Sequence, residues 1–123
     1  MRPNRLQQVA VTALEDIKAK DIKVIDVRRL TSLYDTLVIA SADSTRQVKA
    51  LANNVLEKMK AAGAPIIGVE GEAVGEWVLV DCGDIVVHVM QPAVRAYYNL
   101  EELWTPPSLV RARPQAQIRP ASA

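Results

Sequence analysis

Two stretches of the chain repeat their apolar residues with the period of an α-helix. In residues 4–20 the pattern predicts an amphipathic helix whose apolar positions are Leu6, Val9, Ala10, Ala13, Leu14 and Ile17. A second helix is predicted from Ser44, whose hydroxyl is expected to accept a hydrogen bond from the amide of Gln47. The Gln47 side chain is expected to reach back to the amide of Ser44. Gly63 and Pro65 are expected to end this helix.

Short runs rich in β-branched residues predict strands at residues 22–27, 35–40, 66–69, 77–80 and 85–90. The run at 35–40 is almost continuously apolar, which is typical of a strand covered on both faces. The last two runs are separated by the short turn 81–84, which contains Gly83. They are therefore expected to pair as an antiparallel hairpin.

A last helix is predicted from Pro92, because proline suits the first turn of a helix, where no amide donor is needed. It is expected to run to about Trp104, with these residues facing inward: Tyr97, Leu100, Leu103 and Trp104. The order helix–strand–strand–helix–strand–strand–strand–helix predicts one α/β domain over residues 1–104. Its fold class is a mixed five-stranded sheet flanked by helices.

The composition suits one folded domain in a reducing compartment. The chain has 123 residues, 50% of them apolar, which is enough to form a core. Cys82 is the single cysteine, so neither an internal disulfide nor a thiolate metal site can form. No signal-peptide pattern and no apolar run of roughly 20 residues is present, so a cytoplasmic protein with no membrane partner is expected. Residues 105–123, rich in Pro, Ala and Arg, are expected to be a flexible basic tail.

Charge is unevenly spread along the chain. Residues 61–94 contain no Lys or Arg, but they hold the acids Glu70, Glu72, Glu76, Asp81 and Asp84. A surface of this sign repels a phosphate backbone, so DNA is not an expected partner, and it suits a basic protein. A solvated acidic surface is the plainer interpretation of the same charges.

The residues that could carry catalysis also have structural interpretations. His88, the single histidine, lies within a β-branched strand, where we expect it to be packed and, with Gly83, to support the hairpin. Cys82 is flanked by Asp81 and Asp84, whose charges oppose an active thiolate by raising the thiol pKa. Asp81 and Asp84 could also be metal ligands, but aspartate is common in such turns and no third ligand is evident. No catalytic residue, metal or cofactor is therefore expected.

Several strings of residues, taken in order, resemble the signatures of the Iojap or ribosomal silencing factor family. They are DTLVIAS at 35–41, STRQV at 44–48, VEGE at 69–72, WVLVD at 77–81, GDIVVHV at 83–89 and RAYYNLEELW at 95–104. The similarity spans about residues 6–104. The chain departs from the family pattern at Thr36 and Leu37, where aromatic residues are usual, and at Cys82, where a larger apolar residue is commoner.

The resemblance implies an α/β fold similar to that of nucleotidyltransferases, without their catalytic residues. Members bind the large ribosomal subunit at its fourteenth ribosomal protein, block joining of the small subunit and so lower translation when nutrients are scarce. Members often dimerise, so a homodimer is one expected assembly. The expected contacts with the ribosomal protein are Trp77, as an aromatic anchor, and the acids Glu70, Glu72, Asp81 and Asp84.

Two alternative functions follow from other residues. A degenerate or metal-dependent nucleotidyltransferase would bind nucleotide and a divalent cation near Asp81 and Asp84. An RNA-binding tail would use Arg111, Arg113 and Arg119, although three arginines give only a shallow salt dependence.

Overall fold

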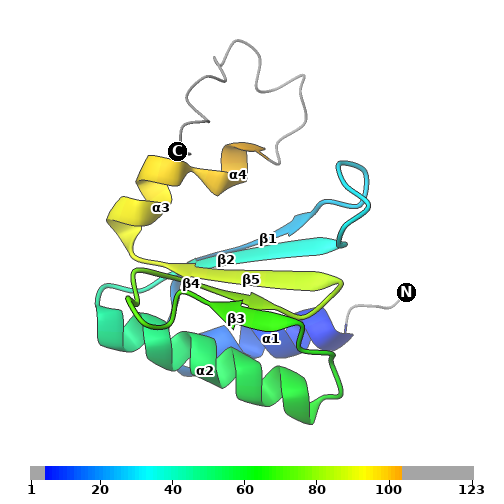
Figure 1. Ribbon diagram of the computed structural model, residues 1–123, viewed down its shortest axis with the longest axis horizontal. Helices are drawn as coiled ribbons and strands as arrows, with labels where there is room; N and C mark the ends of the chain where they lie inside the picture. Colours follow the sequence, from blue (N-terminus) through cyan, green and yellow to red (C-terminus); the bar gives the residue numbers. More distant parts are fainter. Residues whose placement is uncertain (1–4, 104–123) are drawn as a thin grey trace.

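The computed structural model describes residues 5–103, which form one five-stranded sheet with helices on both faces (Figure 1). The elements are α1 (Arg5–Asp16), β1 (Lys20–Asp26), β2 (Thr36–Ser41), α2 (Thr45–Ala61), β3 (Gly68–Glu70), β4 (Trp77–Asp81), β5 (Ile85–Met90), α3 (Pro92–Tyr98) and α4 (Leu100–Leu103). The α/β class and the mixed sheet are confirmed. Within these residues, no helix combines the length and the apolar character that crossing a membrane requires.

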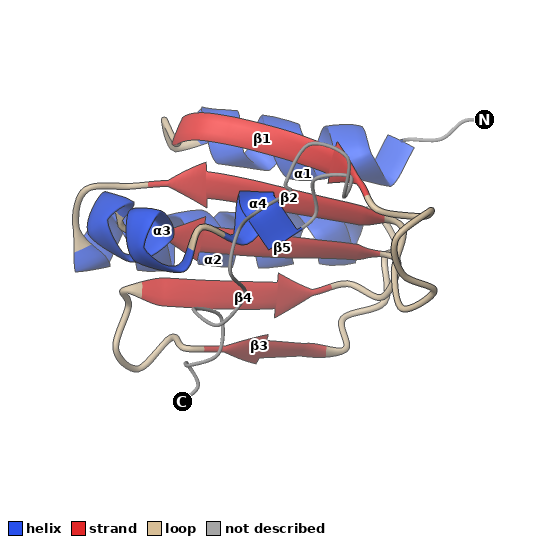
Figure 2. Cartoon of the chain, turned by 90° about the horizontal axis from the view of Figure 1, so that it is seen from above, coloured by secondary structure: helices blue, strands red, loops and turns tan. Residues whose placement is uncertain are grey.

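The strands lie in the order β1-β2-β5-β4-β3 across the sheet, as Figure 2 shows from above. β2 and β5 are parallel, and every other neighbouring pair is antiparallel. The predicted hairpin is present, with Leu79 opposite His88 and Trp77 opposite Met90. Parallel neighbours need a long crossover, which the segment containing α2, β3 and β4 supplies.

The larger core lies between the sheet and the helices α1 and α2. Val38, Val80 and Val87 point into it from three strands, and Leu14 and Leu51 meet them from the helices. All five side chains are fully buried. Burying one such side chain contributes about 1.5–3 kcal/mol to stability. This layer therefore supplies the larger share of the folding free energy.

A second, smaller core lies on the other face of the sheet, on the side of α3 and α4 (Figure 1). Its buried members are Val27, Leu37, Ile39, Val86 and Met90. Val94 of α3 and Leu100 of α4 pack against it. β2 contributes side chains to both cores, which confirms the prediction of a strand covered on both faces.

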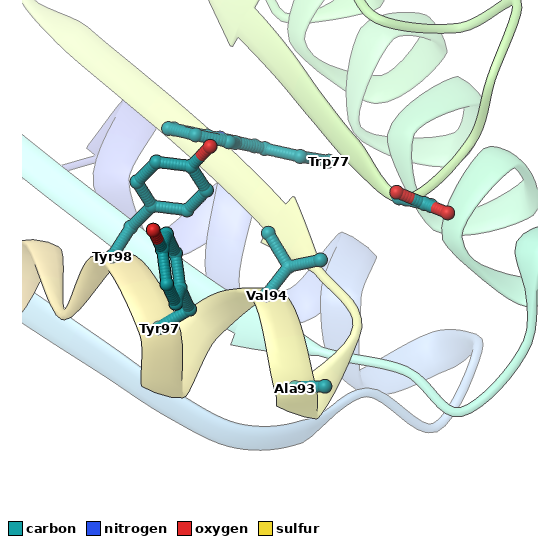
Figure 3. Close-up of a pocket in the computed structure, with 6 residues that line it drawn as sticks. Trp77, Ala93, Val94, Tyr97 and Tyr98 are labelled. Carbon is teal, nitrogen blue, oxygen red and sulfur yellow. The ribbon is translucent and has the colours of Figure 1, made fainter. Parts of the chain in front are cut away.

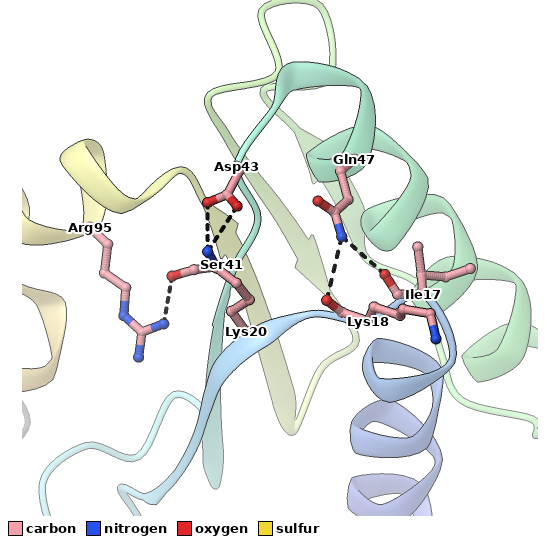
Figure 4. A network of polar contacts seen from close by, with 7 residues as sticks. All are labelled: Ile17, Lys18, Lys20, Ser41, Asp43, Gln47 and Arg95. Carbon is pink, nitrogen blue, oxygen red and sulfur yellow. Dashed lines mark hydrogen bonds and ion pairs between the residues drawn. The ribbon is translucent and has the colours of Figure 1, made fainter.

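The start of α2 ties the two helices of the first layer together. As predicted, Ser44 Oγ accepts a hydrogen bond from the Gln47 amide, at 3.1 Å. The prediction for the Gln47 side chain is wrong, because its Nε2 donates to the carbonyl oxygens of Ile17, at 3.1 Å, and Lys18, at 3.4 Å (Figure 4). These carbonyls follow the end of α1, where helical donors are lacking, and Gln47 satisfies them.

The predicted last helix is wrong in its length and in one of its faces. Asn99 adopts a left-handed conformation, with a φ of 48°, and separates α3 from the single turn of α4. Tyr97 points outward and is 80% exposed, because the break at Asn99 means that Tyr97 and Leu100 no longer lie on one helical face. The expectations for the side chains of Leu103 and Trp104 and for the tail at 105–123 lie outside what the structure describes.

Arg95 fastens α3 and α4 to the sheet. Its guanidinium donates to Ser41 Oγ at the end of β2, at 2.8 Å (Figure 4). It also donates to the carboxylate of Glu101 in α4, at 2.9 Å. The Arg95 side chain is only 11% exposed, so these charge-assisted bonds are largely shielded from water. The position of α3, and of the side chains it carries, is therefore set by β2.

The loop between β3 and β4 bends sharply at Gly71, which has a φ of +90°. A Cβ atom added at this position would collide with the backbone carbonyl oxygen of Trp77. Gly63, which follows α2, has the same φ of +90° but open space around the position of a Cβ atom. Comparing substitutions at the two glycines therefore separates the energetic cost of backbone strain from the cost of a steric collision.

Gly63→Ala should lower the free energy of unfolding by about 1–2 kcal/mol, the cost of a left-handed conformation for a residue with a Cβ atom. Gly71→Ala should lower it by on the order of 3 kcal/mol or more, because a collision adds to the same strain. Urea unfolding followed by circular dichroism measures both losses. Equal losses of stability in the two variants would show that the backbone at Trp77 moves to avoid the added Cβ atom at no cost in free energy.

Candidate partner-binding surface

The pairing of β3 and β4 places three of the predicted contact residues on one face of the sheet. Side chains along a strand alternate between faces, and Val78 points into the first core. Trp77, Leu79 and Asp81 therefore point to the opposite face. Glu70 lies opposite Leu79 in the register and shares that face.

Two neighbours hold the Trp77 side chain in place. Its indole Nε1 donates a hydrogen bond to His88 Nδ1, at 2.9 Å. The ring of Tyr98 packs beside the indole, with 4.9 Å between the ring centroids. Because Nδ1 accepts, the proton of the neutral imidazole is assigned to Nε2. The only polar group of the indole is thus satisfied within the protein, and the half-buried ring offers an apolar surface.

A hollow of about 320 Å³ lies between the start of β4 and α3 (Figure 3). The residues that line it are Glu76, Trp77, Ala93, Val94, Tyr97 and Tyr98. The rings of Tyr97 and Tyr98 meet edge to face, at a centroid distance of 4.9 Å and an interplanar angle of 86°. Tyr97 is 80% and Tyr98 45% exposed. Large aromatic side chains in such open positions are typical of interfaces.

The acids of the β4–β5 turn lie at the far end of β4 from Trp77. Asp81 Oδ1 accepts a hydrogen bond from the Gly83 amide at 3.0 Å, and Gly83 has a φ of +84°. The Asp84 side chain is exposed, while its carbonyl oxygen accepts from the Asp35 amide at 2.8 Å. Asp81 is roughly 13 Å from Trp77 along the strand. The predicted contacts therefore form two groups and not one patch around the turn.

Two further residues from the sequence analysis do not line the hollow. Cys82 is 3% exposed and belongs to the first core, on the opposite face from His88. Burial, together with the charge of Asp81, raises the pKa of the Cys82 thiol to about 11. Glu72 is exposed in the loop between β3 and β4.

Comparison with known proteins identifies the family. The family model described as "Ribosomal silencing factor during starvation" matches residues 1–122. The chain belongs to the ribosomal silencing factor family. A ribosomal silencing factor of Chromobacterium violaceum is 57% identical over 104 residues, which cover 85% of this chain and 85% of that protein. The resemblance predicted from the sequence is confirmed.

Solved structures and a more distant relative extend the comparison with the ribosomal silencing factor family. A crystal structure of a Chromobacterium violaceum protein superposes with a TM-score of 0.82 at 57% identity, covering 85% of this chain and 87% of that one. The mouse protein named "Mitochondrial assembly of ribosomal large subunit protein 1" is 36% identical over 98 residues, or 77% of this chain and 43% of the mouse protein. The likeness to nucleotidyltransferases stays a prediction.

Three residues of the hollow, Glu76, Tyr97 and Tyr98, were not among the contacts predicted for this ribosomal silencing factor. The sequence favours a core position for both tyrosines, because aromatic side chains dominate buried area, and the exposure of both corrects this expectation. The adjacent tyrosines carried no decisive signal, because neighbouring positions are only about 100° apart around a helix and either ring could face the sheet. The position of Glu76 over the hollow depends on how the loop bends and has no signal in the pattern.

Burial lowers the pKa of His88 to about 4, from an ordinary value of 6.5. The folded protein thus holds the neutral imidazole that accepts the hydrogen bond from Trp77, whereas the unfolded chain takes up a proton near pH 6.5. This contribution to stability is complete above pH 6.5 and is lost as the pH falls to about 4. The hydrogen bonds from Arg28 lower the pKa of Asp26 to about 2. Asp26 therefore changes the stability only below about pH 4, outside the range in which His88 does so.

The free energy of unfolding should therefore fall by on the order of 3 kcal/mol between about pH 7 and about pH 4. His88→Gln should flatten this dependence, because glutamine keeps an acceptor but does not titrate. His88 is the single histidine of the chain, so no other imidazole contributes. Urea unfolding at a series of pH values measures both proteins. The same slope in the variant would assign the loss to carboxylates instead.

Proposed function

We propose that this protein is a non-enzymatic repressor of translation that binds the large ribosomal subunit. Its partner there is the fourteenth ribosomal protein, and its bulk prevents the small subunit from joining. Support comes from the family and from the mouse relative, whose name refers to assembly of the large ribosomal subunit. The observation that carries the proposal is the open aromatic surface of Trp77, Tyr97 and Tyr98 in an acidic part of the chain.

The charges in the same part of the chain suit a basic protein. Residues 61–103 carry the acids Glu70, Glu72, Glu76, Asp81, Asp84, Glu101 and Glu102. Arg95 is the only Lys or Arg in this stretch, and its charge is paired with Glu101 at 2.9 Å. The exposed carboxylates of Glu70, Glu72, Glu76 and Asp84 are thus available to steer and bind a cationic surface.

One interface can include both groups of predicted contacts. Trp77 lies at one end of β4 and the Asp81–Asp84 turn at the other, roughly 13 Å along the strand. An interface of ordinary size covers about 800 Å² of each partner, which is wide enough for both. Blocking subunit joining requires only a rigid body at the right place, so no catalytic group is needed. The place of action is then the cytoplasm, and a homodimer stays a prediction.

No observation favours the two alternative functions. The carboxylate of Asp81, a ligand in the nucleotidyltransferase hypothesis, already accepts the Gly83 amide at 3.0 Å. Among residues 5–103 no group of three or more His, Cys, Asp or Glu side chains is arranged to hold a metal ion. The arginines of the RNA-binding hypothesis, Arg111, Arg113 and Arg119, lie outside the described residues.

Sucrose-gradient sedimentation tests the proposal. The full chain should move with isolated large subunits and not with small subunits, and adding it before mixing should reduce the fraction of joined ribosomes. A variant with Glu70→Lys and Asp84→Lys should bind large subunits about tenfold or more weakly, because it places two positive charges before a basic surface. Asp81 is left unchanged, since it shapes the turn.

The matched control carries Glu15→Lys and Glu57→Lys, the same change of charge on exposed positions of α1 and α2. It should bind as the parent protein does. If the two variants bind equally well, the acidic surface is not the docking surface. If the parent leaves subunit joining unchanged, the proposed function is wrong.

A further inference from the structure

We propose that the hollow between Trp77 and α3 binds an arginine side chain of the protein partner. The inference rests on the proposed function and adds to it the chemistry of the group that is recognised. The hollow has a volume of about 320 Å³, at the low end for ligand pockets and suited to a single long side chain. Its walls offer aromatic rings and one carboxylate.

The aromatic walls offer the surfaces of their rings to an incoming group, and the indole N–H of Trp77 is not available to it. The indole N–H of Trp77 is used by His88 at 2.9 Å, so it cannot serve a ligand. Tyr98 stands 4.9 Å from the indole, and Tyr97 stands 4.9 Å from Tyr98. A cation close to such rings is attracted by their negative faces, and tryptophan attracts it most strongly.

Glu76 supplies the opposite charge at the same hollow. It lines the hollow and is exposed, and among the described residues its carboxylate has no hydrogen-bond or ion-pair partner. Its backbone is held in place, because its carbonyl oxygen accepts from the Gln91 amide at 3.0 Å. A carboxylate beside aromatic rings matches a guanidinium, which can stack on a ring while it donates to an acid.

The alternative occupants fit less well. An apolar side chain would fill the hollow but would remove water from Glu76 without giving it a partner. A lysine ammonium is more strongly hydrated than a guanidinium and cannot stack on a ring as a plane. The helix that forms one wall is anchored, because Val94 packs on the second core and Arg95 is bonded to Ser41 at 2.8 Å. The hollow is present in the structure of the chain without a partner.

Two substitutions of Tyr97 distinguish the effect of its aromatic ring from the effect of its apolar bulk. Tyr97→Leu removes the ring and keeps an apolar side chain, whereas Tyr97→Phe keeps the ring. Because Tyr97 is 80% exposed, neither change should disturb folding. In large-subunit sedimentation, Tyr97→Leu and Glu76→Gln should each weaken binding about three- to tenfold, and Tyr97→Phe should bind within about twofold of the parent. If Tyr97→Leu binds as well as Tyr97→Phe, the inference is wrong.

A second measurement does not depend on the ribosome. The full chain, labelled with ¹⁵N, is titrated with acetyl-arginine-amide and with its neutral isostere acetyl-citrulline-amide. The indole N–H signal of Trp77, identified by its loss in Trp77→Phe, should shift with the arginine compound and much less with citrulline. Equal shifts would overturn the inference. If the parent fails to bind large subunits but still discriminates arginine from citrulline, the proposed function fails while the arginine site stands.

Discussion

Apolar side chains of β2 point to both faces of the sheet, and the need to bury them on both faces organises the rest of the molecule. Leu37 and Ile39 point to one core, and Val38 and Ala40 point to the other. Each side must therefore be covered by another layer. α1 and α2 cover one side, and the short segments α3 and α4 are brought back over the other (Figure 1).

The aromatic surface is a consequence of how little helix covers the second side. α3 has 7 residues before the left-handed Asn99 ends it, and its buried contact is made by Val94. The remaining large side chains of α3 have no core to enter. Tyr98 leans on Trp77 and Tyr97 extends into solvent, so the protein displays rings on a helix that Arg95 anchors to the sheet.

Much of this arrangement follows from sequence patterns that reflect simple physics. The period of α2, its Ser44 cap and the hairpin of β4 and β5 are local properties, and each was predicted correctly. The contact of Trp77 with His88 could also be predicted, because the short turn sets the hairpin register and aromatic side chains reach diagonal neighbours across strands. The hydrogen bond from the Gln47 side chain to the carbonyl of Ile17 joins residues far apart in sequence, and no local pattern encodes it. The placement of Glu76 over the hollow depends on the bend of a loop, which the pattern does not encode either.

The unequal covering of the two sides has an evolutionary consequence. Side chains such as Val80 and Leu51 are locked in the first core, where most changes would unfold the molecule. Tyr97 and Glu76 are solvent-facing and support no core, so mutation can alter them with little effect on foldedness. Substitutions at these two positions can thus change what the protein recognises while the fold beneath stays the same.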